Sequence, residues 1–365
     1  MSAGQSARTG IEGGRVRVID GFRAVSIATV VLAHASATGG FPTALAGLLL
    51  PGSSGVAVFF VISGYLITAL LLAEEARTGG VSLRNFYVRR VFRILPALLV
   101  YVAFVAAYDA CRGFQISRVV YANALTFTTG VFAFPPDGWL LQHTWSLAVE
   151  EQFYLVWPLA FVWFSMRRRF VVAAVILVVD PVIRAAACLM HRLTLFHSSL
   201  GWADAIMWGC FAALTAHAHP VVAKRIVSYR PTVVRLVALA VFVTVGKLMW
   251  AGRLGSIVLP FGATLDGVTI AYLIVSYVEG PPDLAARLLA RPAVGRLGVL
   301  SYSLYLWQQF FTVHEQHLHI VDLPLWKSFP WNVAASLFFA GLSYSLVEAP
   351  MLRMRRRYLS SSAPR

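Results

Sequence analysis

The run Gly55–Ala73, GVAVFFVISGYLITALLLA, holds nineteen residues without a single Asp, Glu, Lys or Arg. A transmembrane helix needs about twenty mostly apolar residues, so this run predicts a membrane span. The whole chain has the same character, because 58% of its 365 residues are hydrophobic and only 13% are charged. A soluble domain carries about 25% charged residues, and a soluble core of this size could not bury so much apolar surface. Composition therefore excludes a soluble enzyme, a disordered chain and a small disulfide-stapled domain. It predicts a multi-pass membrane protein.

Further apolar segments extend this prediction to an all-α bundle of about ten transmembrane helices. The segment 119–134 is a re-entrant or interfacial piece or an eleventh span, and hydropathy leaves these alternatives open. We expect a tail at 1–17, one transmembrane domain at 18–352 and a basic tail at 353–365. The ten expected spans lie at roughly 18–38, 55–73, 91–110, 144–166, 170–189, 203–217, 233–250, 257–278, 297–314 and 332–352.

The net charge of +15 fits either nucleic-acid binding or the excess of Lys and Arg that cytoplasmic loops carry. With both termini placed in the cytoplasm, 22 of the 31 Lys and Arg residues fall in inner segments and 5 in outer ones. This bias favours the membrane interpretation, with both termini cytoplasmic and no nucleic-acid partner.

The cysteines and a cluster of histidines give no metal-ligand spacing. Cys111 and Cys188 could pair on the outer face, and the sequence leaves this open. His314, His317 and His319 lie close together in the chain, but no carboxylate or cysteine completes a set of ligands. We expect no metal site.

Charged side chains at membrane depth mark functional sites or paths. The first span carries Arg23 and His34, which are eleven residues apart. A helix places them on one face, separated by about 16.5 Å along its axis. In the fourth span, Glu150 lies about 7.5 Å below Trp145, in the outer half, where His34 also ends. We expect the carboxylate of Glu150 to orient the imidazole of His34. The alternatives are a snorkelling arginine, a histidine bonded to a carbonyl, and a structural ion pair or protonated acid.

Three further patterns stand out in the predicted spans and at their ends, and the first two of them each allow two interpretations. The Ser-Gly pair at 63–64 either permits close helix packing or leaves room for a slim ligand. Arg89 and Arg93 share a helix face at the inner surface, where they either anchor the topology or clamp phosphates. Asp180 and Arg184 have the same spacing and predict an internal ion pair in the fifth span.

Six motifs occur in a fixed order along the chain. They are IDGFR at 19–23 followed by His34, FFVISGYLI at 59–67, FYVRRVFRILP at 86–96, WSLAVEEQFYLVWP at 145–158, LGVLSYSLYLW at 297–307 and VEAP at 347–350. On these motifs the chain resembles the acyltransferase-3 family of membrane O-acyltransferases over nearly its whole length. It departs from the family pattern at Gln308, where a histidine is usual, and at Trp202, where an arginine often precedes Asp204. We do not expect the extracytoplasmic domain that often follows in this family.

The resemblance implies transfer of an acyl group, acetyl by default, from cytoplasmic acyl-CoA. The implied acceptor is a hydroxyl of a carbohydrate, glycan or glycosylated small molecule at the outer side of a bacterial plasma membrane. No permanently bound cofactor is implied, and membrane lipids are the other partners. Together with the spacing of Arg23 and His34, the resemblance implies that the catalytic residues are Arg23, His34 and Glu150. The residues expected to bind the donor are Arg23, Ser63, Gly64, Tyr65, Arg89, Arg90 and Arg93. The residues expected to bind the acceptor are Trp145, Tyr154, Asp204 and Tyr302.

A transporter or flippase with an intramembrane Arg/His/Glu path is the main alternative. A second alternative is a structural or sensing protein whose polar residues only join helices. The sequence shows no internal repeat of the kind that many transporters contain. The acceptor, the acyl chain length and the oligomeric state stay open.

Overall fold

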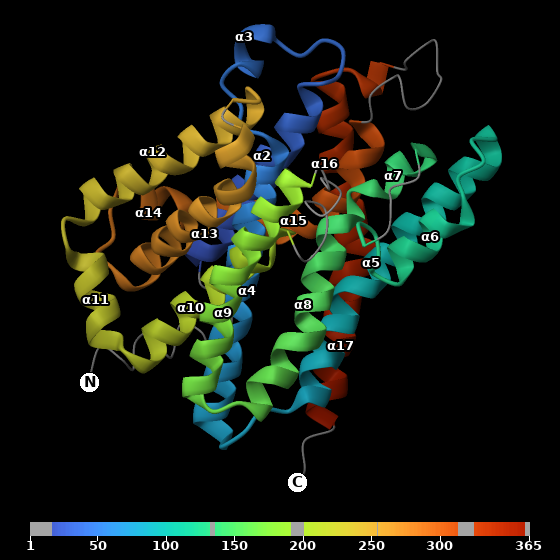
Figure 1. Ribbon diagram of the computed structural model, residues 1–365. Coiled ribbons are helices and arrows are strands. Elements are labelled where there is room, and N and C mark those ends of the chain that lie inside the picture. Colours follow the sequence, from blue (N-terminus) through green and yellow to red (C-terminus); the bar gives the residue numbers. More distant parts are fainter. Residues whose placement is uncertain (1–16, 132–135, 191–200, 254, 313–324, 362–365) are drawn as a thin grey trace. The chain divides into compact units, whose positions relative to one another are not determined.

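The computed structural model describes residues 17–131, 136–190, 201–253, 255–312 and 325–361. Within these ranges the chain folds into helices and contains no strand (Figure 1), which confirms the all-α prediction. The helices divide between two compact units, formed by residues 1–30, 50–81 and 149–299 and by residues 31–49, 82–148 and 300–365. Helices α2, α8 and α15 contribute residues to both units.

The first unit contains most of α2 (Arg17–Ala35) and of α8 (Thr144–Trp163). Its complete helices are α4 (Gly52–Thr78), α9 (Met166–Leu189), α10 (Ala203–Ala218), α11 (Pro220–Ser228), α12 (Pro231–Trp250), α13 (Gly255–Glu279) and α14 (Leu284–Leu289).

The second unit contains most of α15 (Pro292–Phe311). Its other helical elements are α3 (Thr43–Ala46), α5 (Leu83–Arg112), α6 (Arg118–Leu125), η1 (Pro136–Gly138), α7 (Trp139–Gln142), η5 (Leu325–Lys327), α16 (Trp331–Ser343), the π-helical turn η6 (Tyr344–Glu348) and α17 (Ala349–Ser361).

Each of the ten predicted spans contains a helix, but not every helix has the length and apolar character of a span. In the described part of the chain, seven helices meet both conditions, or eight if α10 and α11 form one broken span with a bend of 112°. Helices α8 and α15 are long enough at 20 residues each, but their polar side chains keep them outside this group. The count of ten and the side on which the termini lie therefore stay predictions.

The segment 119–134 does not form a span of its own. Its helix, α6, has only 8 residues, whereas crossing the hydrocarbon core requires about 20. The side chain of Ser117 caps this helix by accepting a hydrogen bond from the Val119 N–H at 3.3 Å. Residues 132–135 lie outside the described part of the chain.

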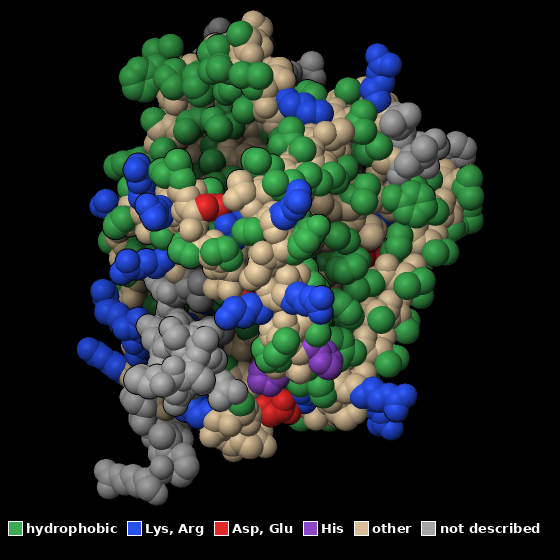
Figure 2. All heavy atoms as spheres, turned by 90° about the vertical axis from the view of Figure 1, so that its left-hand side faces the viewer, with side chains coloured by type: hydrophobic (Ala, Val, Ile, Leu, Met, Phe, Trp, Pro, Cys, Tyr) green, Lys and Arg blue, Asp and Glu red, His purple; other side chains and the backbone are tan. Residues whose placement is uncertain are grey.

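Many large apolar side chains are exposed on the surface of the helices. Along α9, Val171, Val175, Val178 and Val182 are each more than half exposed, and their spacing places them on one helix face. Figure 2 shows hydrophobic side chains spread over one face of the molecule among scattered Lys and Arg side chains. An apolar face of this kind is suited to lipid, and the protein is a multi-pass membrane protein.

In the second unit, a cluster of aromatic and aliphatic side chains joins α5, α6, α7 and α15. Ser82 begins α5 by accepting a hydrogen bond from the Asn85 N–H, and Gly113 ends it in the left-handed conformation at φ 70°. The hydroxyl of Tyr101 donates to the carbonyl of Leu140 at 2.8 Å, which ties α5 to α7. This core supports the end of α15 that carries Trp307 and Gln308.

Candidate functional site

The imidazole of His34 is held by Gln308, one of the residues at which the chain departs from the family pattern. His34 lies in the last turn of α2, and its Nδ1 is 2.8 Å from Oε1 of Gln308 on α15. The hydroxyl of Thr312 also donates to this oxygen, at 3.0 Å. An amide oxygen can only accept, so Nδ1 carries a hydrogen, and in the neutral ring Nε2 then carries the lone pair. A half-buried imidazole in this tautomer is equipped to accept a proton at Nε2.

A second buried imidazole, which sequence reasoning missed, lies within electrostatic range of His34. The ring of His143 is packed between Tyr101 and Tyr305, with centroid distances of 5.5 and 5.4 Å. The hydroxyl of Tyr305 donates to the His143 carbonyl at 2.8 Å and lies 2.6 Å from the Ser146 hydroxyl. His143 stands two residues before the motif that starts at Trp145, so extending that motif would have found it.

Arginines from two helices gather in the second unit. Helix α17 packs against α5, and Arg355 lies within electrostatic range of Arg89, Arg90 and Arg93. The guanidinium of Arg90 lies 5.6 Å from the centroid of the Phe86 ring. Like charges repel, so four cations at one place favour a multiply charged anion as their ligand. The sequence placed the three arginines of α5 together but assigned Arg355 only to the basic tail.

Two residues predicted to bind the acceptor also belong to the second unit. The hydroxyl of Tyr302 donates to the carbonyl of Ile94 at 2.8 Å, which joins α15 to α5. Trp145 lies in the first turn of α8 and is half-buried. Their roles toward an acceptor stay predictions.

In the first unit, Ser63, Glu150 and Tyr154 form a hydrogen-bonded cluster. The Ser63 hydroxyl donates to Oε1 of Glu150 at 2.8 Å. The Tyr154 hydroxyl donates to Ser63 Oγ at 2.8 Å and approaches Oε2 of Glu150 at 3.3 Å. Both carboxylate oxygens of Glu150 are thus engaged by hydroxyl groups. The predicted pairing of Glu150 with His34 stays a prediction.

The glycine of the Ser-Gly pair serves helix packing. A Cβ atom at Gly64 would collide with the carbonyl oxygen of Ile206, and one at Gly209 would collide with that of Val61. Helices α4 and α10 therefore approach closely through two glycines, as small residues allow in membranes. The packing interpretation accounts for Gly64. The next residue, Tyr65, is buried, and the donor-binding role of 63–65 stays a prediction.

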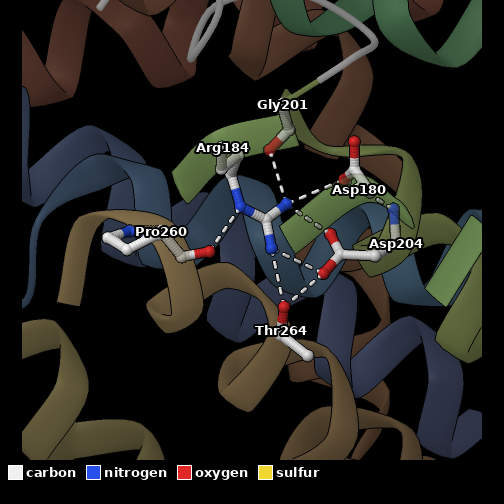
Figure 3. A network of polar contacts seen from close by, with 6 residues as sticks. All are labelled: Asp180, Arg184, Gly201, Asp204, Pro260 and Thr264. Atoms are coloured by element: carbon white, nitrogen blue, oxygen red, sulfur yellow. Dashed lines mark hydrogen bonds and ion pairs between the residues drawn. The ribbon is translucent and has the colours of Figure 1, made fainter. Parts of the chain in front are cut away.

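The ion pair predicted for the fifth span is present and is larger than expected. Arg184 reaches Oδ2 of Asp180 at 2.8 Å, and it binds both oxygens of Asp204 at 2.8 and 2.7 Å. The same guanidinium also donates to the carbonyls of Pro260 and Gly201 and to the Thr264 hydroxyl (Figure 3). Two buried carboxylates from α9 and α10 thus share one guanidinium. Asp204, predicted to bind the acceptor, has both carboxylate oxygens bonded within this network.

Other predicted residues have less defined surroundings. Arg23 lies on the same uninterrupted helix α2 as His34, as predicted, and it is half-buried. Cys111, Cys188 and Cys210 are free thiols. The histidines at 314, 317 and 319 lie outside the described residues. Among the residues that are described, no group of His, Cys, Asp or Glu side chains could hold a metal ion.

Comparison with known proteins identifies a family to which this chain is similar. The family model described as an acyltransferase domain matches residues 16–348. The chain is 28% identical to "O-acetyltransferase OatA" of Staphylococcus aureus over 91% of its own length and 56% of that protein. It is 28% identical to "Putative peptidoglycan O-acetyltransferase YrhL" of Bacillus subtilis, covering 91% of this chain and 54% of that one. A "Putative O-acetyltransferase" of Staphylococcus aureus strain COL is 27% identical, with 91% and 56% covered.

The chain spans a little over half the length of these curated relatives. No solved structure matches it. The family model covers five of the six motifs, the first two residues of the sixth, and the helices from α2 to the end of η6. This chain therefore belongs to the acyltransferase-3 family.

Proposed function

We propose that this protein is a membrane O-acetyltransferase in which His34 acts as the general base. The contact between His34 and Gln308 carries the proposal, because it leaves Nε2 free to take a proton from an acceptor hydroxyl. The hydroxyl oxygen then attacks the carbonyl carbon of an acetyl thioester and the C–S bond breaks. The imidazolium returns the proton to the departing thiolate of coenzyme A. General base catalysis of this kind contributes about 10²–10⁴-fold to a rate.

The proposed donor is acetyl-CoA, bound on the cytoplasmic side. Its nucleotide end carries several phosphate charges, and the arginines at 89, 90, 93 and 355 supply matching cations and bidentate donors. Arg23, at the other end of α2 from His34, is the further proposed phosphate ligand. The pantetheine arm would then follow α2 towards His34, with Ser63 and Tyr65 beside its path.

Glu150 is proposed to complete the catalytic group. Ser63 and Tyr154 hold its carboxylate through the hydrogen bonds described above, which support a fixed orientation. We propose that this carboxylate stabilises the imidazolium that forms during transfer. The proposed acceptor is a glycan hydroxyl at the extracytoplasmic side, with Trp145, Tyr302 and Asp204 as candidate contacts. The names of the relatives, which refer to O-acetyltransferases and in one case to peptidoglycan, support an acceptor of this class.

The direct test uses the purified full chain in lipid nanodiscs with acetyl-CoA labelled in the acetyl group. We expect release of the free thiol of coenzyme A and transfer of label to a glycan fraction from the native host. Mass spectrometry of surface glycans from a deletion strain should show the loss of one acetyl mass. A protein that neither consumes the thioester nor changes these glycans would be a transporter or a structural protein.

A further inference from the structure

One buried cation in the described part of the chain lacks the partner that the others have. Four Lys and Arg side chains there are at least 95% buried. Three are arginines, and each reaches a carboxylate oxygen at 2.7 Å, in the pairs Arg169–Glu75, Arg184–Asp204 and Arg235–Asp283. The fourth is Lys327 at 1% exposure, and its Nζ has no hydrogen-bond partner. A buried charge is strongly unfavourable unless it is paired, so this ammonium group is missing an anion.

The surroundings of Lys327 fit a ligand better than a structural role. Its Nζ lies 5.2 Å from the ring centroids of both Phe310 and Trp326, so cation–π attraction offsets only part of the burial. The nearby charge is a second cation, Arg112, which adds to the burial in lowering the pKa of Lys327 to about 8. The ammonium form therefore still prevails at pH 7. In the described part of the chain, Lys327 is thus under the influence of a second cation and no carboxylate is bonded to its Nζ, an arrangement that favours an anion as the ligand.

The site is connected to the imidazole of His34 through short segments of the second unit. Phe310 follows two residues after Gln308, whose side chain holds His34. Nδ2 of Asn332 donates both to the carbonyl of Lys327 at 3.3 Å and to the hydroxyl of Thr38 at 2.8 Å. Thr38 lies four residues after His34 in the chain. Asn332 thus links the backbone of Lys327 to the segment that follows the proposed base.

We propose that Lys327 and Arg112 bind the carboxylate of an acidic carbohydrate, with Trp326 as the surface on which the sugar ring stacks. Trp326 is 36% exposed and Phe310 lies parallel behind it at 5.9 Å and 9°. Sugar rings present C–H groups that pack on aromatic side chains, and the exposed part of Trp326 is available for such a contact. This inference rests on the proposed function and narrows its acceptor to acidic glycans.

The test compares acid and neutral forms of the same sugar. The probes are oligomers of galacturonate, glucuronate and sialic acid, each beside its carboxyl-reduced form, together with inorganic phosphate. Wild-type protein, Lys327→Met, Lys327→Arg and the exposed control Lys224→Met are purified as full chains in nanodiscs. Two readouts are taken at pH 7, namely the ligand-induced shift in Tm and the kcat and KM for acetyl transfer.

We expect at least one acid oligomer to raise the Tm of the wild type while its reduced form does not. Lys327→Met should abolish this shift and raise the KM for the acid oligomer about tenfold, with kcat nearly unchanged. Lys327→Arg should retain part of the shift, and Lys224→Met should behave as the wild type. The unliganded Lys327→Met protein should have a raised Tm, because the substitution removes an unpaired buried charge. A purely structural lysine would give a lowered Tm instead.

Three results would overturn the inference. They are no Tm shift with any acid oligomer, an equal shift in Lys327→Met, or a shift with phosphate that equals the shift with the acid sugars. Failure of the proposed function is recognised separately. Carboxylate-dependent Tm shifts without acetyl transfer would support the binding site and contradict the proposed function. Acetyl transfer with the same KM in the wild type and in Lys327→Met would support the proposed function and contradict the binding site.

Discussion

Gln308 on α15 accepts a hydrogen bond from Nδ1 of His34 on α2 at 2.8 Å. The contact joins residues that are 274 positions apart in the chain. It performs with a neutral amide the orienting role that a carboxylate often has beside a catalytic histidine. The position where the family usually has histidine therefore still contributes to the site. The free lone pair on Nε2 follows from this one contact.

Replacing Gln308 tests the tautomer directly. We expect Gln308→Ala to lower kcat for acetyl transfer about fivefold, because one orienting hydrogen bond is worth roughly 1 kcal/mol. Gln308→Glu keeps the acceptor and adds a charge that favours imidazolium, so it should retain activity and move the acidic limb of the pH–rate profile to higher pH. An alanine variant with unchanged kcat, or a glutamate variant with an unmoved profile, would contradict the orienting role.

The arginine cluster on α5 and α17 should control the affinity for the donor. We expect Arg355→Ala and Arg89→Ala each to raise the KM for acetyl-CoA about tenfold or more, since charge-assisted hydrogen bonds contribute about 1.5–3 kcal/mol. The KM for the acceptor should not change. Added salt should raise the KM of the wild type more than that of either variant, because salt screens exposed charges. Arg225→Ala, an exposed position on α11, is the control, and an effect confined to the acceptor would count against this assignment.

The shared guanidinium of Arg184 should be a main source of stability in the first unit. Removing it leaves the carboxylates of Asp180 and Asp204 buried without their cation, which typically costs about 3–5 kcal/mol. We expect Arg184→Met to lower Tm strongly, and Arg184→Met combined with Asp204→Asn to lower it less than the two single changes added together. Thermal unfolding in detergent measures this. Strict additivity of the two changes would show that the side chains do not act as one network.

The stability of the wild type should depend on pH through Lys327. The group lies outside the membrane-spanning helices, and burial together with Arg112 lowers its pKa from 10.5 to about 8. Between these values the unfolded chain binds more protons than the folded one, so stability rises with pH from about 8 to 10.5. We expect Tm to increase over this window in the wild type and to increase less in Lys327→Met. Identical pH profiles for the two proteins would show that Lys327 does not titrate in this window.

Local patterns in the sequence were enough for features that lie within one helix. Runs of apolar residues placed a helix in each of the ten expected segments, because burial in lipid requires such runs whatever the rest of the fold does. The pair Asp180–Arg184 was predictable for the same reason, since a spacing of four residues places both on one helix face. Arg23 and His34 likewise share α2.

Features that depend on packing between distant segments were not predictable. Asp204 joins Arg184 only because α10 packs against α9, and Arg355 reaches the arginines of α5 only because α17 lies beside α5. A single sequence contains no signal for such contacts. The contact of Gln308 with His34 was not predictable for the same reason, since it joins α15 to α2. The predicted span count exceeds the number of helices that have full span character, because α8 and α15 carry buried polar side chains such as Ser146 and Gln308.

The central claim is that Nε2 of His34 takes the proton from the acceptor. Its most direct test is the kcat of His34→Ala for acetyl transfer in nanodiscs, beside His219→Ala as an exposed histidine control. We expect His34→Ala to lose at least about 10²-fold in kcat, while its Tm and its binding of acetyl-CoA stay close to those of the wild type. The control should keep full activity. A His34→Ala protein that binds acetyl-CoA and transfers acetyl at the wild-type rate would contradict the account.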